Sequence, residues 1–133
     1  MDAMDSALSQ IIDRVRDSAA RQAPLCIRGG GTKDFHGPGA PRHAGEPLDM
    51  RPLAGIVSYE PSELVVTVRG GTPLAELEAT LAIQGQCLAF EPPHFGAAST
   101  VGGMVAAGLS GPSRASVGAV RDFVLGLEMI NGQ

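Results

Sequence analysis

Tryptophan is absent from this 133-residue sequence, and cysteine, histidine and positive charge are all scarce. Two cysteines, Cys26 and Cys87, are too few for a disulfide-stabilised secreted scaffold, so we expect both to be small core residues of a reduced, cytoplasmic protein. The three histidines show no metal-ligand spacing, which argues against a metal site. Ten Lys and Arg against fourteen Asp and Glu give a net charge of −4, which argues against a nucleic-acid partner.

Long apolar runs are missing too. No stretch approaches the ~20 apolar residues that a membrane-spanning helix needs, and residues 1–17 are acidic and amphipathic, unlike a signal peptide. Glycine and proline are abundant instead, with 18 Gly and 10 Pro among 133 residues. That share is about 21%, against an average near ~12%. The excess predicts many turns and a place where bare backbone approaches a ligand.

The spacing of apolar residues predicts an α+β fold, in which helices flank a small mixed sheet. The N-terminal helix is expected over residues 6–22 with Ser6 as N-cap, and the first strand, at Leu25–Ile27, is expected to be buried. The other expected strands lie near 48–50, 56–60, 63–69 and 123–130, and the other helices over 72–84 and 100–108.

The helix over 72–84 has the clearest end signals. Thr72 is the expected N-cap, Pro73 the first helical residue and Gly85 the left-handed residue that ends the helix. Its apolar side is formed by Leu74, Leu77, Leu81 and Ile83. At the other end of the chain, Asn131-Gly132 is typical of a hairpin turn, but no returning strand follows, so we expect the chain to be truncated there.

Two glycine-rich segments are candidates for anion binding. Residues 29–33 follow a strand, where consecutive backbone N–H groups can form an anion-binding nest, although a surface turn without a ligand is the alternative. Residues 99–103 begin a helix of small residues, and they predict a second cradle or simply tight helix packing. Two cradles suit a diphosphate, and Lys33 and Arg114 are candidates for additional charge, although each alone is more typical of a solvated surface group. The first segment matches neither the P-loop nor the Rossmann fingerprint.

Taken in order, RGGGTKDFHG, EPPHFG, GGMVAAGLSGPSR and VRDFVLG resemble the FAD-binding half of the vanillyl-alcohol oxidase/p-cresol methylhydroxylase superfamily. Within this superfamily they are most similar to the FAD-binding subunits of bacterial glycolate oxidases. The resemblance implies that residues 1–133 form the first lobe of a two-lobed PCMH-type FAD-binding domain with the start of the second lobe, and that the substrate cap is absent. The cofactor-binding residues that it implies are Gly29, Gly30, Gly31, Thr32, Lys33, Ser99, Thr100, Gly102, Gly103, Ser110, Gly111 and Val124.

Thr32 stands where some members of the superfamily carry a histidine that bonds covalently to the flavin, so non-covalent FAD is implied. The implied function is an oxidoreductase that acts on a 2-hydroxy acid, glycolate being favoured, with this chain inactive alone. Its implied partners are other subunits of a glycolate oxidase complex, in the cytoplasm or held at the inner membrane by those subunits. A non-catalytic FAD-holding or assembly module, and another flavoprotein of the superfamily, remain alternatives.

Three side chains outside these segments invite a catalytic interpretation. His94 lies in a proline-rich loop, where a positional role is favoured over that of a catalytic base. Arg121 and Asp122 are expected to pair with each other or to cap a strand end. The sequence contains no Ser–His–Asp or Cys–His arrangement, and flavin chemistry needs none because the cofactor carries out the redox step.

Overall fold

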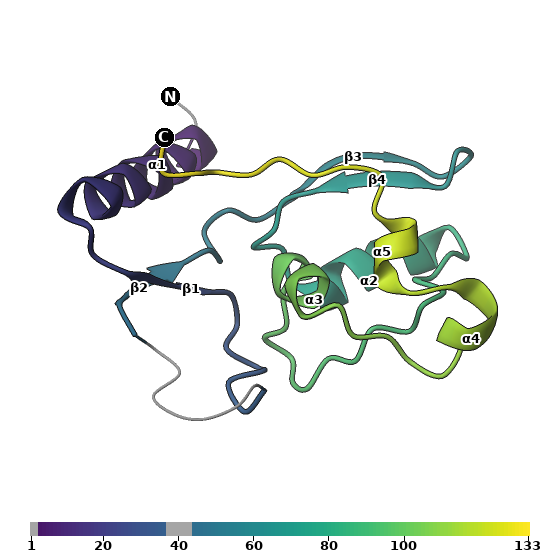
Figure 1. Cartoon of the computed structure of the whole chain (residues 1–133). Helices are drawn as coiled ribbons and strands as arrows, with labels where there is room; N and C mark the ends of the chain where they lie inside the picture. The colour runs from purple at the N-terminus through teal and green to yellow at the C-terminus, as the bar shows by residue number, and fades with distance from the viewer. Residues whose placement is uncertain (1–2, 37–43) are drawn as a thin grey trace.

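The structure, a computed structural model, describes residues 3–36 and 44–133. Helix α1 (Ala3–Arg21) leads into strands β1 (Leu25–Arg28) and β2 (Glu46–Asp49), which are followed by the hairpin of β3 (Ile56–Glu60) and β4 (Val65–Val68). Helices α2 (Leu74–Ile83), α3 (Val101–Ala107), α4 (Arg114–Val117) and α5 (Val120–Phe123) follow (Figure 1). The C-terminal segment then returns to α1, where Gly132 packs against Ala19.

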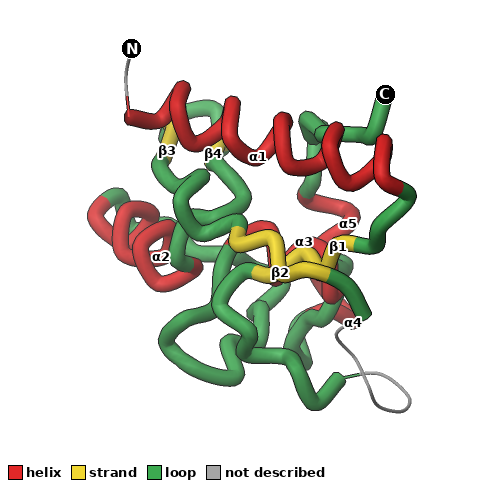
Figure 2. The backbone as a smooth tube through the Cα atoms, turned by 90° about the vertical axis from the view of Figure 1, so that its left-hand side faces the viewer, coloured by secondary structure: helices red, strands yellow, loops and turns green. Residues whose placement is uncertain are grey.

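The strands form two separate sheets, so the expectation of one mixed sheet is wrong (Figure 2). Strands β1 and β2 pair in parallel, with Leu25 opposite Glu46, whereas β3 and β4 pair antiparallel. Between the two sheets the chain turns at residues 50–55, where Leu53 N–H donates to the Met50 carbonyl at 3.1 Å. Ile27 is 73% exposed, so the expectation of a fully buried first strand is also wrong.

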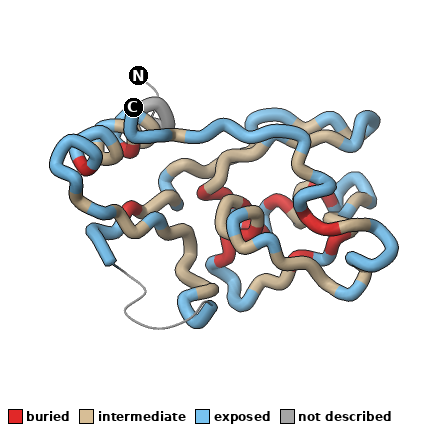
Figure 3. Tube along the Cα trace, viewed as in Figure 1, coloured by how far each residue is buried: buried red, intermediate tan, exposed pale blue. Residues whose placement is uncertain are grey.

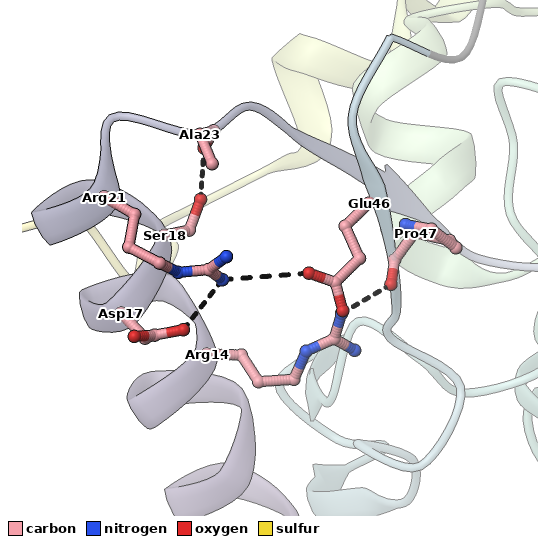
Figure 4. Close-up of polar contacts among 7 residues, drawn as sticks. All are labelled: Arg14, Asp17, Ser18, Arg21, Ala23, Glu46 and Pro47. Atoms are coloured by element: carbon pink, nitrogen blue, oxygen red, sulfur yellow. Dashed lines mark hydrogen bonds and ion pairs between the residues drawn. The ribbon is translucent and has the colours of Figure 1, made fainter.

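Helix α1 begins before Ser6, so Ser6 is not its N-cap and instead accepts a hydrogen bond from Gln10. Arg14 and Arg21 fasten the helix to β2 through the single carboxylate of Glu46 (Figure 4). Arg14 Nη2 lies 2.9 Å from Glu46 Oε1 and also donates to the Pro47 carbonyl at 2.8 Å. Polar contacts at the surface therefore position this helix.

The core lies where α2, α3 and α5 meet the β3–β4 hairpin (Figure 3). Leu74, Leu77 and Leu81 are buried as predicted, but Ile83 is 80% exposed because it lies on the far side of the last turn of α2. The remaining buried members are Phe90, Val101, Met104 and Val120. Cys26 is half-buried and Cys87 exposed, so the prediction that both are core residues is wrong.

Helix α2 ends as predicted, with Gly85 in the left-handed conformation at φ +66°. Its predicted N-cap is wrong by one residue, because Pro73 occupies that position. The Thr72 hydroxyl accepts a hydrogen bond from Gly55 N–H at 2.9 Å and donates one to the Arg69 carbonyl at 2.7 Å. Thr72 therefore joins the chain before the hairpin to the chain after it.

The predicted strand over 123–130 does not form. Asp122 accepts a hydrogen bond from Ala119 N–H at 2.8 Å, and this cap draws residues 120–123 into α5. Val124 is extended, but residues 124–130 form no ladder with any part of the chain that the structure describes. At the predicted hairpin turn, Gln133 N–H donates to the Asn131 side chain and no second strand is described.

Candidate functional site

Residues 29–33, which we call the glycine loop, follow the end of β1 with three successive glycines and then Thr32 and Lys33. Within residues 3–36 and 44–133, none of their five N–H groups has a hydrogen-bond acceptor. Gly31 has a φ of +68°, a conformation that glycine adopts without strain and that turns successive N–H groups toward one side. The glycine loop therefore has the donors that an anion requires.

The two predicted glycine segments lie against each other. A Cβ atom on Gly29 would meet the Thr100 side chain, and one on Gly30 would meet the Ala98 backbone. Lys33 extends the contact by donating from Nζ to the Ser99 hydroxyl at 3.4 Å. Residues 66 positions apart in the sequence therefore share one site, as the hypothesis of two cradles for one diphosphate requires.

Residues 99–103 do not present their N–H groups as predicted. Val101 N–H donates to the Thr72 carbonyl at 2.9 Å, and Gly102 N–H donates to the Gly70 carbonyl at 2.8 Å. Thr100 is the N-cap of α3 and accepts from Gly103 N–H at 3.2 Å. Gly102 therefore permits close packing on Gly70, which was the alternative interpretation for this segment. The free amides belong to the glycine loop.

Ser110, Gly111 and Val124 lie in a second region. The Ser110 hydroxyl accepts from Val120 N–H at 3.3 Å, and Gly111 N–H donates to the Phe90 carbonyl at 2.9 Å. Val124 lines a hollow of about 420 Å³ whose lining includes no residue of the glycine loop. The wall of this hollow consists of Val105, Gly108, Arg114, Ala119, Val120, Arg121, Val124 and Leu127.

Charged side chains around the glycine loop are mostly paired. Arg28 contacts Asp34, and Arg51 contacts Asp49 at 2.8 Å, on either side of a hollow of about 190 Å³ lined by Gly29, Gly30 and Gly31. Hydrogen bonds from Arg51 lower the pKa of the Asp49 carboxyl. Sequence reasoning missed these two pairs, because the glycines drew attention to the backbone and the partners of the charged side chains were not considered.

Lys33 differs from these arginines, because it contacts no carboxylate in the part of the chain that the structure describes. Partial burial lowers the pKa of its ammonium group. A cation beside five free N–H groups makes this corner electropositive in a chain whose net charge is −4. Arg114, the other predicted charge, lines the separate 420 Å³ hollow.

His94 Nε2 lies 2.8 Å from Glu78 Oε2 on α2, an arrangement that fixes the loop of residues 91–96. This contact favours the positional role over that of a catalytic base. Asp122 lies 3.9 Å from Arg121 and caps α5, so the predicted pairing forms and the cap is at a helix rather than at a strand. Among the described residues no cluster of metal-ligating side chains occurs, and no described helix is long and apolar enough to cross a membrane.

The residues present fit a dinucleotide that is anionic in its middle, because a phosphate needs N–H donors and a cation, both of which the glycine loop supplies. Gly29 and Gly30 bring this donor row close against residues 98–100, because a Cβ atom on either would meet Thr100 or Ala98. The fit to a diphosphate therefore rests on the N–H groups and the ammonium group of the glycine loop.

Comparison with known proteins identifies the family. Residues 6–133 match the family described as "FAD binding domain". The chain is 48% identical over 122 residues to glycolate oxidase subunit GlcE of Escherichia coli (strain K12), which covers 92% of this chain and 34% of that protein. The chain therefore spans about a third of the length of this curated relative.

Two crystal forms of alkyldihydroxyacetonephosphate synthase share the fold, each with a TM-score of 0.65, at 23% and 24% identity. Each match covers 86% of this chain and 21% or 22% of the synthase. The synthase therefore shares the architecture of small sheets with helices. With the family match spanning residues 6–133, the chain belongs to the FAD-binding domain family.

Proposed function

We propose that this chain holds the diphosphate of FAD on its glycine loop, as part of an FAD-dependent oxidoreductase that acts on glycolate or a similar 2-hydroxy acid. The row of five free N–H groups over residues 29–33 supports this proposal most directly. The similarity to GlcE supports the choice of substrate. When bound, FAD supplies the redox chemistry, accepting a hydride equivalent from the hydroxy acid.

The residues of the proposed site divide by role. Gly29, Gly30, Gly31, Thr32 and Lys33 donate N–H groups to the diphosphate, and the Lys33 ammonium neutralises part of its charge. Behind the loop, Ser99 holds Lys33 and Thr100 caps α3 by accepting from Gly103 N–H. Gly102 fastens the start of α3 to Gly70 through its N–H. Ser110 and Gly111 shape the second region, and Val124 offers an apolar wall in the 420 Å³ hollow to the adenosine.

Thr32 makes the binding non-covalent in this proposal, because its hydroxyl cannot form the bond that a histidine at this position makes to the flavin. Retention of FAD then depends on contacts alone. A chain that spans 34% of its relative offers part of those contacts, while the entropy cost of association is undiminished. We therefore propose that this chain alone binds FAD weakly and does not oxidise glycolate.

The remaining parts of the proposal concern the assembly. We propose that other subunits of a glycolate oxidase complex complete the enzyme and that the complex works in the cytoplasm or at the inner membrane through those subunits. The similarity to GlcE, a protein named as a subunit, supports this assignment.

FAD titration of the purified chain, followed by flavin fluorescence, tests the site. Lys33→Gln should weaken binding about tenfold and reduce its salt dependence, because one phosphate-facing cation is lost. Arg16→Gln is the matched control, since Arg16 is an exposed cation on α1 that does not line the hollow beside the glycine loop, and it should leave the affinity within about twofold. Absence of FAD binding at about 1 mM would refute the proposal, as would equal effects of the two variants.

A further inference from the structure

The extended stretch of residues 124–130 has no pairing partner in the part of the chain that the structure describes. Its backbone makes no turn or bend, and Gly126 is not in the left-handed conformation. Within residues 3–36 and 44–133, none of the N–H or C=O groups of residues 125–130 has a backbone hydrogen-bond partner. Figure 3 shows that the stretch is exposed along most of its length between α5 and α1. A second strand therefore has access to it.

The side chains of this stretch alternate as they do along a strand. Leu125, Leu127 and Met129 are 81%, 70% and 80% exposed. Because residues two apart in extended backbone point to the same face, these three side chains form one apolar row. An apolar row beside unpaired backbone groups is the combination that favours pairing with another strand.

The strands of the two sheets protect their edges, and residues 124–130 do not. Strand β2 contains Pro47, β3 has a register shift between Ile56 and Ser58, and β1 and β4 have only four residues each. Shortness, proline and bulges are devices that prevent edge-to-edge pairing. Residues 124–130 form a longer stretch without proline, and Glu128 carries its only charge.

The order of the side chains in this stretch makes it complementary to itself. An antiparallel pair of two such stretches, centred on the middle residue, sets apolar side chains opposite one another. These pairs are Leu127 with Leu127, Leu125 with Met129 and Val124 with Ile130. Cross-strand apolar pairs of this kind stabilise a sheet.

The charge of Glu128 selects this register. In the pair centred on Leu127, Glu128 faces Gly126 of the second copy. A parallel in-register pair, or an antiparallel pair centred on Glu128, would instead set this carboxylate beside its own copy. Like charges opposite each other destabilise a strand pair. The favoured register is therefore two-fold symmetric, which is the symmetry of a closed dimer.

We propose that residues 124–130 are an interaction surface for a second copy of this chain, joined as antiparallel strands about a two-fold axis at Leu127. The occupant is a second copy because the stretch complements itself in both apolar side chains and charge. One short strand from each copy makes a contact below the ~1,200 Å² of a stable interface. The dimer is therefore reversible, with a dissociation constant on the order of 10–100 µM.

Sedimentation equilibrium of the purified chain, from about 5 to 500 µM, measures this dimer. Leu127→Lys sets two like charges at the centre of the pair and should weaken dimerisation at least about tenfold. Ile83→Lys is the matched control, because Ile83 is also 80% exposed but lies on α2. The control should leave the dissociation constant within about twofold.

A variant that adds a contact tests the register. Gly126→Lys introduces a side chain where a Cβ atom would meet no atom within 4 Å, and its ammonium group would face Glu128 of the second copy. Since the dimer contains this pair twice, dimerisation should tighten about three- to tenfold at low salt, and the gain should disappear at high salt. Gly126→Gln, which adds a side chain without charge, should lack this salt-dependent gain.

Nuclear Overhauser contacts in a mixture of isotope-labelled and unlabelled chain identify the pairing without any variant. We expect contacts between Leu125 of one copy and Met129 of the other. A chain that stays monomeric at about 500 µM would overturn the inference, as would a dimer that lacks these contacts or survives Leu127→Lys. Assemblies that keep growing with concentration would also overturn it, because an open series of strands is not a two-fold pair.

Discussion

The close approach of the glycine loop to residues 98–100 predicts a large penalty for the smallest possible side chain at Gly30. A Cβ atom there would overlap the Ala98 carbonyl oxygen and would lie 3.0 Å from the Ala98 Cβ atom. The obstacle is backbone, which cannot rotate away as a flexible side chain does. Gly30→Ala must therefore push the glycine loop and residues 98–100 apart.

The size of the effect follows from the kind of contact. Adding one carbon to a tightly packed site costs about 1–3 kcal/mol, and a clash with a carbonyl group lies near the upper end, about 3 kcal/mol. For a domain of this size, about 4 °C of melting temperature corresponds to 1 kcal/mol. We therefore expect Gly30→Ala to lower the melting temperature by roughly 10 °C.

Circular dichroism during thermal unfolding measures this shift, and Gly126→Ala is the control. Gly126 is exposed, and a Cβ atom on it would meet no atom within 4 Å. This control should change stability by no more than about 0.5 kcal/mol. Melting of Gly30→Ala within about 2 °C of the unmodified chain would refute the reasoning. If Gly30→Ala lowers the melting temperature and also abolishes FAD binding, the loss of binding comes from displacement of the glycine loop, since the added carbon faces Ala98.

Three further predictions concern other parts of the chain. Thr72 is fully buried, and Thr72→Val leaves the half-buried Gly55 N–H without its acceptor. The variant should cost about 1–3 kcal/mol in urea unfolding, whereas Thr72→Ser should lose clearly less. Equal losses would contradict the role of the hydroxyl. Arg51 lowers the pKa of Asp49 in the folded chain. The pair therefore stabilises the fold at pH values above the unfolded pKa of Asp49, about 3.9, and this stabilisation is lost as the pH falls through the lower pKa that Asp49 has in the folded chain. Asp49→Asn should therefore reduce the fall in melting temperature between about pH 4 and pH 2, by a small amount because both groups are largely exposed, and an unchanged pH profile would count against it. Acid precipitation of the FAD-loaded protein should release all yellow colour to the supernatant, and colour that stays with the precipitate would show a covalent flavin.

Local sequence signals predicted the elements whose ends depend on single residues. Pro73 and Gly85 placed α2 to within two residues at each end, because one restricts the chain conformation and the other supplies a positive φ. The apolar face of α2 was also predictable, since Leu74, Leu77 and Leu81 repeat at helical spacing. The FAD-binding family was predictable as well, because its glycine-rich motifs are continuous stretches of sequence that do not depend on contacts across the fold.

Contacts between residues far apart in the sequence could not be predicted from local sequence patterns. The largely apolar stretch over residues 123–130 is typical of a strand, but a strand forms only beside another. The carboxylate of Asp122 favoured a short helix at its start instead. Similarly, the sequence suggested amides at the start of α3 as ligand donors, whereas the Gly70 and Thr72 carbonyls already accept two of them. Which N–H groups remain free depends on the fold and cannot be inferred from glycine content.

The attachment of α1 to β2 has a consequence for how the molecule opens. Ile11 is the one buried apolar side chain among those that the structure describes in this helix, and the Arg14 and Arg21 pairs with Glu46 lie at the surface. Exposed ion pairs contribute about 1 kcal/mol or less each, far below what the leucine cluster around α2 contributes. We therefore expect helix α1 to open as a separate cooperative unit. Its amide hydrogens should exchange with solvent while those of α2 stay protected, and its release should leave residues 22–24 accessible to proteases.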